Sequence, residues 1–164
     1  MDFKEIFLYL IESGGDIHVR EDDSIESGMR ILHDVVVPYM SESQNSERHL
    51  SAVAMLCKAT FGYVMRIAAS NVITQQEVIS SMQGLYERKN HDYGNVWQEE
   101  LEVLGMEAMR IRMWEKTRRA ITILDDPSGR MVSDESAYDT LVDICNYCVM
   151  TAMWLVNDKG VSLF

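Results

Sequence analysis

The sequence predicts an all-α protein, and three observations lead to this fold class. Apolar residues recur every three or four positions along almost the whole chain, as they do on the buried face of a helix. No segment alternates between apolar and polar residues for long enough to predict a strand. The 164 residues include only two prolines but twelve methionines, a composition that favours helices and adaptable side-chain packing.

Six helices are expected from this periodicity, and capping or breaking residues mark most of their ends. The expected ranges are about 2–12, 22–40, 46–69, 74–91, 105–124 and 134–157. The boundary signals are Gly14 and Gly15, Asp22 or Asp23, Ser46, Thr74, the run Asp125–Gly129, and Ser133 with Asp134. The segment 46–69 is apolar over much of its circumference, which predicts a central core helix.

Length and composition predict one domain spanning residues 1–164, because the polar connections are too short to separate two. The N-terminus carries acidic residues where a signal peptide needs basic ones, and no run of apolar residues is long enough to span a membrane. We therefore expect a soluble cytoplasmic protein. Cys145 and Cys148 lie in an apolar helical segment, where packing is favoured over zinc or redox chemistry.

The net charge of −11 argues against binding to a nucleic-acid backbone, which such a surface would repel. The charge is unevenly distributed, however. Residues 105–124 contain five basic side chains and two acidic ones. A small anionic ligand is compatible with this basic helix.

Acidic residues form a strip along the last expected helix. Glu135, Asp139, Asp143 and Asn146 follow one another at spacings of four, four and three, beside the apolar face of the same helix. Like charges at these spacings repel, so the strip predicts a cation or basic group facing it. A solvated acidic edge is the simpler interpretation, and the terminal amide of Asn146 favours a ligand instead.

A mixed-charge strip occurs on the preceding helix, where Arg112, Glu115 and Arg119 share a face. One interpretation is a surface ion pair between Glu115 and Arg119. The other is a ligand site, in which the carboxylate binds Mg²⁺ and the guanidinium groups bind phosphate oxygens.

The stretch "YERKNHDYGNVWQ", residues 86–98, is unusually rich in both polar and aromatic residues. Glu87 and Asn90 share a helical face, and we expect Asp92, Tyr93 and Gly94 to leave the helix in a turn. A helix C-cap and turn would account for part of this composition. Lys89, Asn90, Asp92 and Tyr93 also supply a cation, an amide, a carboxylate and an aromatic ring, which together suit nucleotide recognition.

Three motifs in this order resemble a phage and bacterial family called nucleotide modification associated domain 1. They are "KNHDYGNVW" (89–97), "RMWEKTRR" (112–119) and "DESAYDTLVDICNY" (134–147). The resemblance covers about residues 75–158 and leaves the N-terminal helices, residues 1–71, outside it. We expect those helices to cover the core or to complete a dimer interface.

The family is in turn similar to MazG-like all-α nucleotide pyrophosphohydrolases, which bind Mg²⁺ through helix-borne carboxylates. The resemblance implies a helical bundle with a MazG-like four-helix core and extra N-terminal helices, a nucleotide ligand and a homo-oligomer, most simply a homodimer. The MazG-like pattern pairs an E-x-x-E helix with an E-x-x-D helix. This chain departs from it, with a lone Glu115 between Arg112 and Lys116 and with Asp139 and Asp143 four residues apart.

Two functions follow from the resemblance. In the first, the protein is a Mg²⁺-dependent pyrophosphohydrolase of nucleoside triphosphates, acting in nucleotide-pool or modified-base metabolism in the cytoplasm of a phage host. In the second, it binds a nucleotide or nucleotide signal without turnover, for example to counter host defence, and its carboxylates pair with basic side chains. The metal ligands would be Glu87, Glu115, Asp139 and Asp143, of which the last three would be catalytic. The ligand-binding residues would be Lys89, Asn90, Asp92, Tyr93, Arg112, Lys116, Arg119 and Asn146.

Overall fold

The computed structural model describes residues 1–15, 24–42, 44–70, 73–93, 95–125 and 136–163, apart from the side chains of Ser70, Asp92 and Tyr93. All regular elements in these ranges are helical, which confirms the predicted all-α class. The α-helices are α1 (Phe3–Ser13), α2 (Ile25–Ile31), α3 (Ser46–Ser70), α4 (Gln75–Tyr93), α5 (Val96–Leu104), α6 (Met106–Asp125) and α7 (Ala137–Met153). Shorter helical turns are η1 (Leu32–Val36), η2 (Val37–Ser41) and η4 (Trp154–Asp158).

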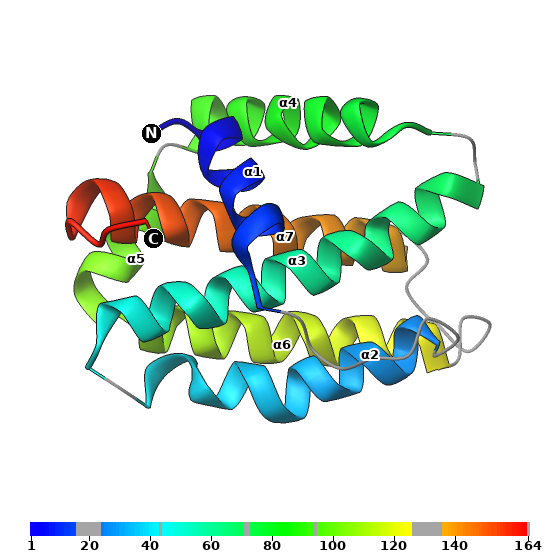
Figure 1. Cartoon of the computed structure of the whole chain (residues 1–164), viewed down its shortest axis with the longest axis horizontal. Coiled ribbons are helices and arrows are strands. Elements are labelled where there is room, and N and C mark those ends of the chain that lie inside the picture. Colours follow the sequence, from blue (N-terminus) through cyan, green and yellow to red (C-terminus); the bar gives the residue numbers. More distant parts are fainter. Residues whose placement is uncertain (16–23, 43, 71–72, 94, 126–135, 164) are drawn as a thin grey trace.

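Helices α3 and α7 pack against each other at the centre of the bundle (Figure 1). The segment from α2 to η2 lies beside α6 on one side of this pair, and α1 crosses α3 and α7. Helix α4 lies on the side opposite α2 and makes few contacts with α1, α3 and α7. The loose packing of α4 leaves a groove between α4 and α7.

Helix α1 begins at a capping box in which the Asp2 side chain accepts from the backbone N–H of Glu5 and the Glu5 side chain accepts from that of Asp2. Its buried face includes Phe3 and Phe7. At its C-terminal end the chain passes close to α3, because a Cβ on Gly14 would lie 2.6 Å from the carbonyl oxygen of Ala54. Glycine is therefore required at this crossing for steric reasons.

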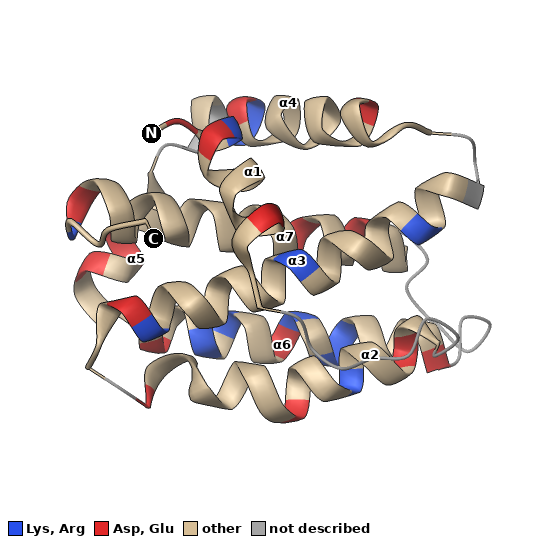
Figure 2. Ribbon diagram, viewed as in Figure 1, with Lys and Arg blue, Asp and Glu red and all other residues tan. Residues whose placement is uncertain are grey.

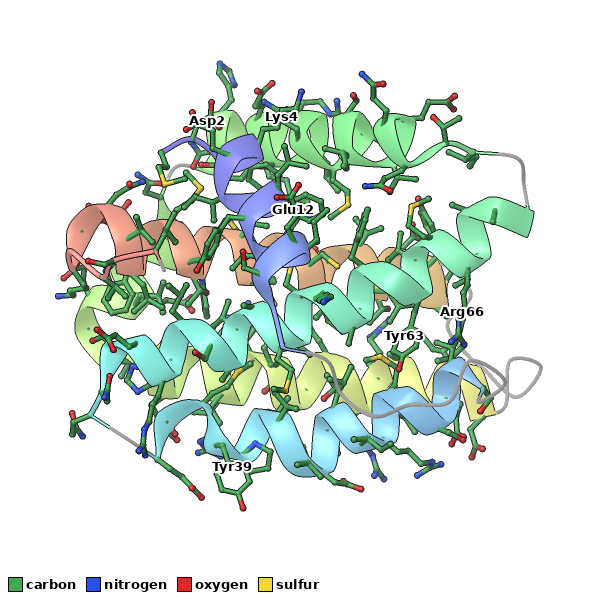
Figure 3. All side chains as sticks on the ribbon, in the orientation of Figure 1. Asp2, Lys4, Glu12, Tyr39, Tyr63 and Arg66 are labelled. Carbon is green, nitrogen blue, oxygen red and sulfur yellow. The ribbon has the colours of Figure 1, made fainter. Side chains whose placement is uncertain are left out.

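The helix expected at 22–40 is one continuous segment with three kinds of helical turn. Helix α2 begins after its N-cap Ser24. Residues 22 and 23 of the expected helix lie outside the described residues. A π-helical turn, η1, and a 3₁₀ turn, η2, follow α2. Pro38 gives the physical reason, because it has no N–H to donate to the preceding turn and its ring disfavours regular α-helix there. On the outer side of this segment Tyr39 points away from the bundle (Figure 3).

The two central helices carry most of the core. Helix α3 contains a stretch, Ser46–Ala69, that is long and apolar enough to cross a membrane by composition, but half of its most apolar window is buried inside the bundle. The three cysteines, Cys57 on α3 and Cys145 and Cys148 on α7, are fully buried. Burial raises the pKa of Cys145 and Cys148 well above the ordinary value, so these thiols stay protonated at neutral pH.

The region between α4 and α6 differs from the sequence prediction. We expected the chain to leave the helix at Asp92, but α4 continues through Tyr93. Helix α5 was not predicted, because a nine-residue helix with a short apolar pattern gives a weak periodic signal. It ends at Gly105, whose positive φ of 63° separates it from α6.

The last helix begins later than predicted. Ser136 is the N-cap of α7, and its side chain accepts from the backbone N–H of Asp139. Residues 134 and 135 of the expected helix lie outside the described residues.

Candidate functional site

The groove between α4 and α7 contains a cavity of about 160 Å³. Helix α5 closes one wall of it with Trp97. The residues on α7 that line it are spaced by three, one and three positions, which places them on one helical face. The lining consists of Tyr86, Lys89, Asn90, Val96, Trp97, Asp143, Asn146, Tyr147 and Met150.

Asp143 is held by two lysines from two different helices. One carboxylate oxygen lies 2.6 Å from Nζ of Lys116 on α6, and the other lies 3.4 Å from Nζ of Lys89 on α4. The Lys116 and Asp143 side chains are only 19% and 21% exposed, so this pair is shielded from solvent more than an ordinary surface pair. At Asp143, the negative charge of the acidic strip is thus paired with the ammonium groups of Lys89 and Lys116.

Arg112 lies behind the cavity wall. Its guanidinium donates to the hydroxyl of Tyr147 at 2.9 Å and to the carboxylate of Glu100 at 3.2 Å. It also lies over the rings of Trp97 and Tyr147, at 5.5 and 5.3 Å from their centroids. Arg112 therefore ties α6 to α5 and α7 and fixes the aromatic wall. Figure 2 shows that α6 carries several of the basic side chains of the chain.

The aromatic wall is positioned by a second set of contacts. Trp97 and Tyr147 meet edge to face, with ring centroids 4.8 Å apart. The indole N–H of Trp97 donates to the hydroxyl of Thr151 on α7 at 3.0 Å. These contacts join α5 to α7 and set the position of the cavity wall on this side.

Asn146 differs from the other cavity residues because it is polar, buried and has an unpaired side-chain oxygen. Its side chain is 4% exposed, and its Oδ1 atom has no hydrogen-bond partner among the described residues. A buried amide oxygen without a donor costs free energy, on the order of 1–3 kcal/mol. Thr60 Oγ1 on α3 is also unpaired, but Thr60 lines none of the cavities described here. Asn146 thus combines a place in the lining of the central cavity with a buried, unpaired side-chain oxygen.

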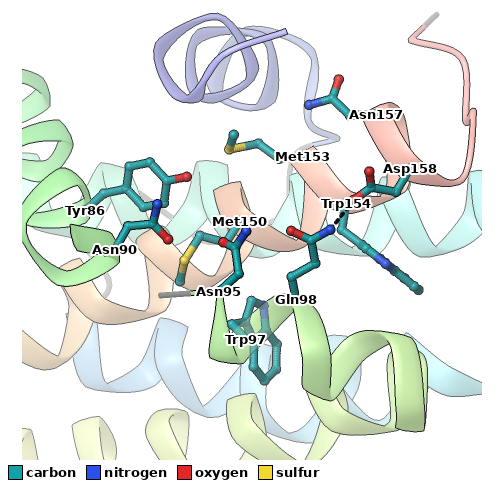
Figure 4. Close-up of a pocket in the computed structure, with 10 residues that line it drawn as sticks. All are labelled: Tyr86, Asn90, Asn95, Trp97, Gln98, Met150, Met153, Trp154, Asn157 and Asp158. Atoms are coloured by element: carbon teal, nitrogen blue, oxygen red, sulfur yellow. Dashed lines mark hydrogen bonds between the residues drawn. The ribbon is translucent and has the colours of Figure 1, made fainter. Parts of the chain in front are cut away.

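Two further cavities continue the groove in either direction. One of about 190 Å³ lies between α4, α5 and η4 and shares Tyr86, Asn90, Trp97 and Met150 with the central cavity (Figure 4). The other, of about 250 Å³, shares Lys89 and Asp143 and adds Arg88 to the lining. The groove is therefore longer than the central cavity alone.

The structure brings together only part of the predicted site. Lys89, Asn90, Asp143 and Asn146 line the central cavity, and Lys116 reaches it through Asp143. The side chains of Asp92 and Tyr93 lie outside the described residues. The roles assigned to these residues stay predictions.

Four predicted residues lie outside the central cavity, although Asp139 lines the 250 Å³ cavity of the groove. The carboxylate of Asp139 accepts from the hydroxyl of Ser136 at 2.8 Å and so caps its own helix. Glu87 accepts from Gln83 at 3.3 Å on the outer face of α4. The side chains of Glu115 and Arg119 are exposed on α6 and line none of the three groove cavities.

Among the described residues, no set of side chains matches the predicted Mg²⁺ site. Mg²⁺ needs several oxygen ligands around one point, and no group of three acidic, cysteine or histidine side chains among the described residues is arranged to hold a metal ion. Asp143 and Asp139 are occupied by lysines and by a helix cap. The residues present do not fit a magnesium centre in this conformation, and we derive no chemical step through one.

Several site residues were missed by the sequence analysis. Trp97 and Tyr147 belong to the motifs that were recognised, but only their polar neighbours were assigned to the ligand. The spacing of Asp143, Asn146, Tyr147 and Met150 on one helical face would have been a usable signal. Tyr86 carried no such signal, since its position depends on how α4 lies over α7.

Among its described residues the protein is all-α, and a groove between α4 and α7 combines a lysine, an aspartate, two asparagines and an aromatic wall. Residues 89–155 match the model of the family described as nucleotide modification associated domain 1. The resemblance predicted from the three motifs is thus confirmed over these residues, which include the central cavity's α7 face and the C-terminal part of α4. No curated protein and no solved structure matches the chain. The further similarity to MazG-like enzymes stays a prediction.

Proposed function

We propose that the groove between α4 and α7 binds a nucleoside phosphate, and that it does so without hydrolysing it. The observation that carries this proposal is a cavity whose lining combines Lys89, an aromatic wall and Asn146, the residue with a buried and unpaired Oδ1. The match of residues 89–155 to a nucleotide-associated family supports the ligand class.

The cations of the groove suit a phosphate group. Lys89 and Lys116 together carry two positive charges against the single negative charge of Asp143. The positive charges exceed the negative one locally, although the whole chain has a net charge of −11. A long polyanion would be repelled by the rest of the surface, whereas a small phosphate would meet mainly these local cations.

In the free protein, Asp143 takes the place that a phosphate oxygen would have between the two ammonium groups. A bound phosphate would compete with the Asp143 carboxylate for Lys89 and Lys116. Lys89 is the more adaptable partner, because its side chain is 54% exposed and its contact with Asp143 is the longer one. The phosphate would therefore recruit Lys89 first.

The interactions of the Asp139 and Asp143 carboxylates favour binding without turnover over hydrolysis. Pyrophosphohydrolysis would need acidic side chains free to hold a metal ion, and Asp139 and Asp143 have other partners. A protein of this kind would sense or sequester its nucleotide.

The test is a panel of ribo- and deoxyribonucleotides, each incubated with the protein in EDTA and separately in Mg²⁺. Unfolding temperature and ligand chromatography are both recorded. At 100 times the dissociation constant a ligand stabilises by about 2.7 kcal/mol, which raises the melting temperature of a chain of this length by roughly 5–10 °C.

We expect such a shift in EDTA with at least one nucleotide and no monophosphate or pyrophosphate product with Mg²⁺. If product forms, the protein is an enzyme, and the proposal of binding without hydrolysis is wrong. The absence of any shift would reject nucleotide binding.

A further inference from the structure

The cavity between α4, α5 and η4 has a different chemistry from the rest of the groove. Amide side chains line it from three elements: Asn90 on α4, Asn95 and Gln98 at α5, and Asn157 on η4. Figure 4 shows these amides around a space that also meets Tyr86, Trp97 and Trp154. No lysine or arginine is among the described residues that line it.

Part of the hydrogen-bonding capacity of this cavity is unused. The side-chain amides of Asn90 and Asn95 make no hydrogen bond with any described residue, and Asn95 does not cap α5 with its side chain. Gln98 donates to Asp158 at 3.0 Å through its NH₂ group, which leaves its carbonyl oxygen available. Donors and acceptors therefore lie next to aromatic and methionine side chains, the environment that recognises an uncharged planar heterocycle.

The cavity at the other end of the groove contains charged side chains of both signs. Arg88 and Lys89 line it together with the hydroxyl-bearing Ser81 and Tyr138, although Asp139 and Asp143 also contribute. The groove thus has lysine and arginine side chains at one end, whereas the lining at the other end has amides, aromatic rings and one carboxylate, Asp158, but no described lysine or arginine. Asn146 lies between the two ends, in the central cavity.

We propose that the amide-lined cavity is the base subsite of the groove, so that Asn95 and Gln98 determine which base is bound. This inference rests on the proposed nucleotide function. The order of the three cavities matches the covalent order of a nucleotide, with the base in the amide-lined cavity, the pentose beside Asn146 and the phosphates at Arg88 and Lys89.

The Asn146 side chain supports this orientation. Its unpaired Oδ1 accepts hydrogen bonds and needs a donor. A pentose hydroxyl is a donor, whereas an ionised phosphate oxygen is only an acceptor. A phosphate at Asn146 would leave Oδ1 unpaired. A pentose hydroxyl would pair with Oδ1 once the Asn146 side chain turns toward the cavity, because this atom is closed to solvent in the free protein.

Tyr86 contributes a positioned ring to the base subsite. It stacks on Phe3 of α1 with centroids 4.6 Å apart, which fixes its orientation. Burial raises the pKa of Tyr86, so its hydroxyl stays protonated and can donate to a base acceptor.

The experiment uses isothermal titration calorimetry on the full chain with three probes: the nucleotide that binds best, the corresponding pentose 5-phosphate, and inorganic pyrophosphate. The variants are Asn95→Ala and Gln98→Ala, with Gln83→Ala as a matched control. The Gln83 amide also lies on the helical framework, but its partner is Glu87, outside the groove. Asn95→Ala removes an exposed side chain without a hydrogen bond, so folding is preserved, and melting temperatures confirm this.

We expect each base-subsite variant to weaken nucleotide binding about three- to tenfold, as for the loss of one neutral hydrogen bond, and to leave pentose 5-phosphate binding unchanged. The Gln83 variant should bind all three probes like the wild type. If both variants bind the nucleotide as tightly as the wild type does, the base subsite is wrong while the proposed function stands. If the wild type binds no nucleotide, the proposed function itself fails.

Discussion

Replacing Asp143 by asparagine should tighten nucleotide binding. In the free protein the carboxylate accepts from Lys116 at 2.6 Å and from Lys89 at 3.4 Å, so it neutralises half of the positive charge that a phosphate would meet. Asparagine keeps the size and one acceptor oxygen but removes the negative charge. A phosphate bound to the same lysines then no longer competes with, or repels, this carboxylate.

The magnitude follows from Coulomb's law. A phosphate on the far side of the two ammonium groups would lie about 6 Å from the Asp143 carboxylate, where two unit charges repel by roughly 1–3 kcal/mol for an effective dielectric constant between about 80 and 20. The affinity should therefore rise by about fivefold or more at low salt, and less at high salt. The loss of two partly exposed ion pairs should lower the free energy of unfolding by about 1–2 kcal/mol.

Calorimetric titration with nucleotide in EDTA, at two salt concentrations, measures this effect. Asp34→Asn is the matched control, because it changes the net charge equally at an exposed position on η1, away from the groove. It should leave the affinity almost unchanged. Weaker binding by the Asp143 variant, or a loss of Mg²⁺-dependent turnover, would refute the reasoning, because Asp143 would then contact the ligand or a metal directly.

Three further predictions concern stability. Burial lowers the pKa of His33, so its protonation disfavours the folded state; stability should be unaffected above the unfolded-state pKa of about 6.5 and fall as pH drops through that value. His33→Gln should reduce this pH dependence in chemical denaturation, and an unchanged slope would contradict it. Gly14→Ala should destabilise by about 1–3 kcal/mol because its Cβ meets backbone, whereas Gly62→Ala, in open space on α3, should stabilise by roughly 0.5–1 kcal/mol. The thermal melts of the two variants should shift in opposite directions. Trp97→Phe should cost about 1–2 kcal/mol by removing the donor to Thr151, and an unaltered melting temperature would show that this bond does not hold α5.

The long helices could be predicted from the sequence because each is a sustained periodic segment with recognisable caps. Their packing explains why the prediction succeeds: the apolar faces of α3 and α7 are the core. The short helix α5 was not predicted, since nine residues hold few periodic apolar positions, and its packing on α7 through Trp97 and Tyr147 is a tertiary contact. The π turn before Pro38 likewise depends on local backbone geometry that the periodicity does not report.

The candidate site was predictable in its residue types and only partly in its pairings. The acidic strip correctly indicated that something positive faces Asp143, and the structure shows that Lys116 and Lys89 do so. The sequence could not decide between lysine and a metal ion, because the answer depends on how α4 and α6 are rotated about α7. The role of Asp139 in capping α7 was missed, although Ser136, three residues before it, is a capping signal in the sequence.

A crystal structure of the protein with a saturating nucleoside monophosphate, prepared in EDTA, tests the central claim most directly. We predict a nucleotide in the groove between α4 and α7, with its phosphate at Lys89, a donor group within hydrogen-bond distance of Asn146 Oδ1, and its base between Tyr86, Asn95 and Gln98. A nucleotide bound outside this groove, or an empty groove at saturating ligand, would contradict the account.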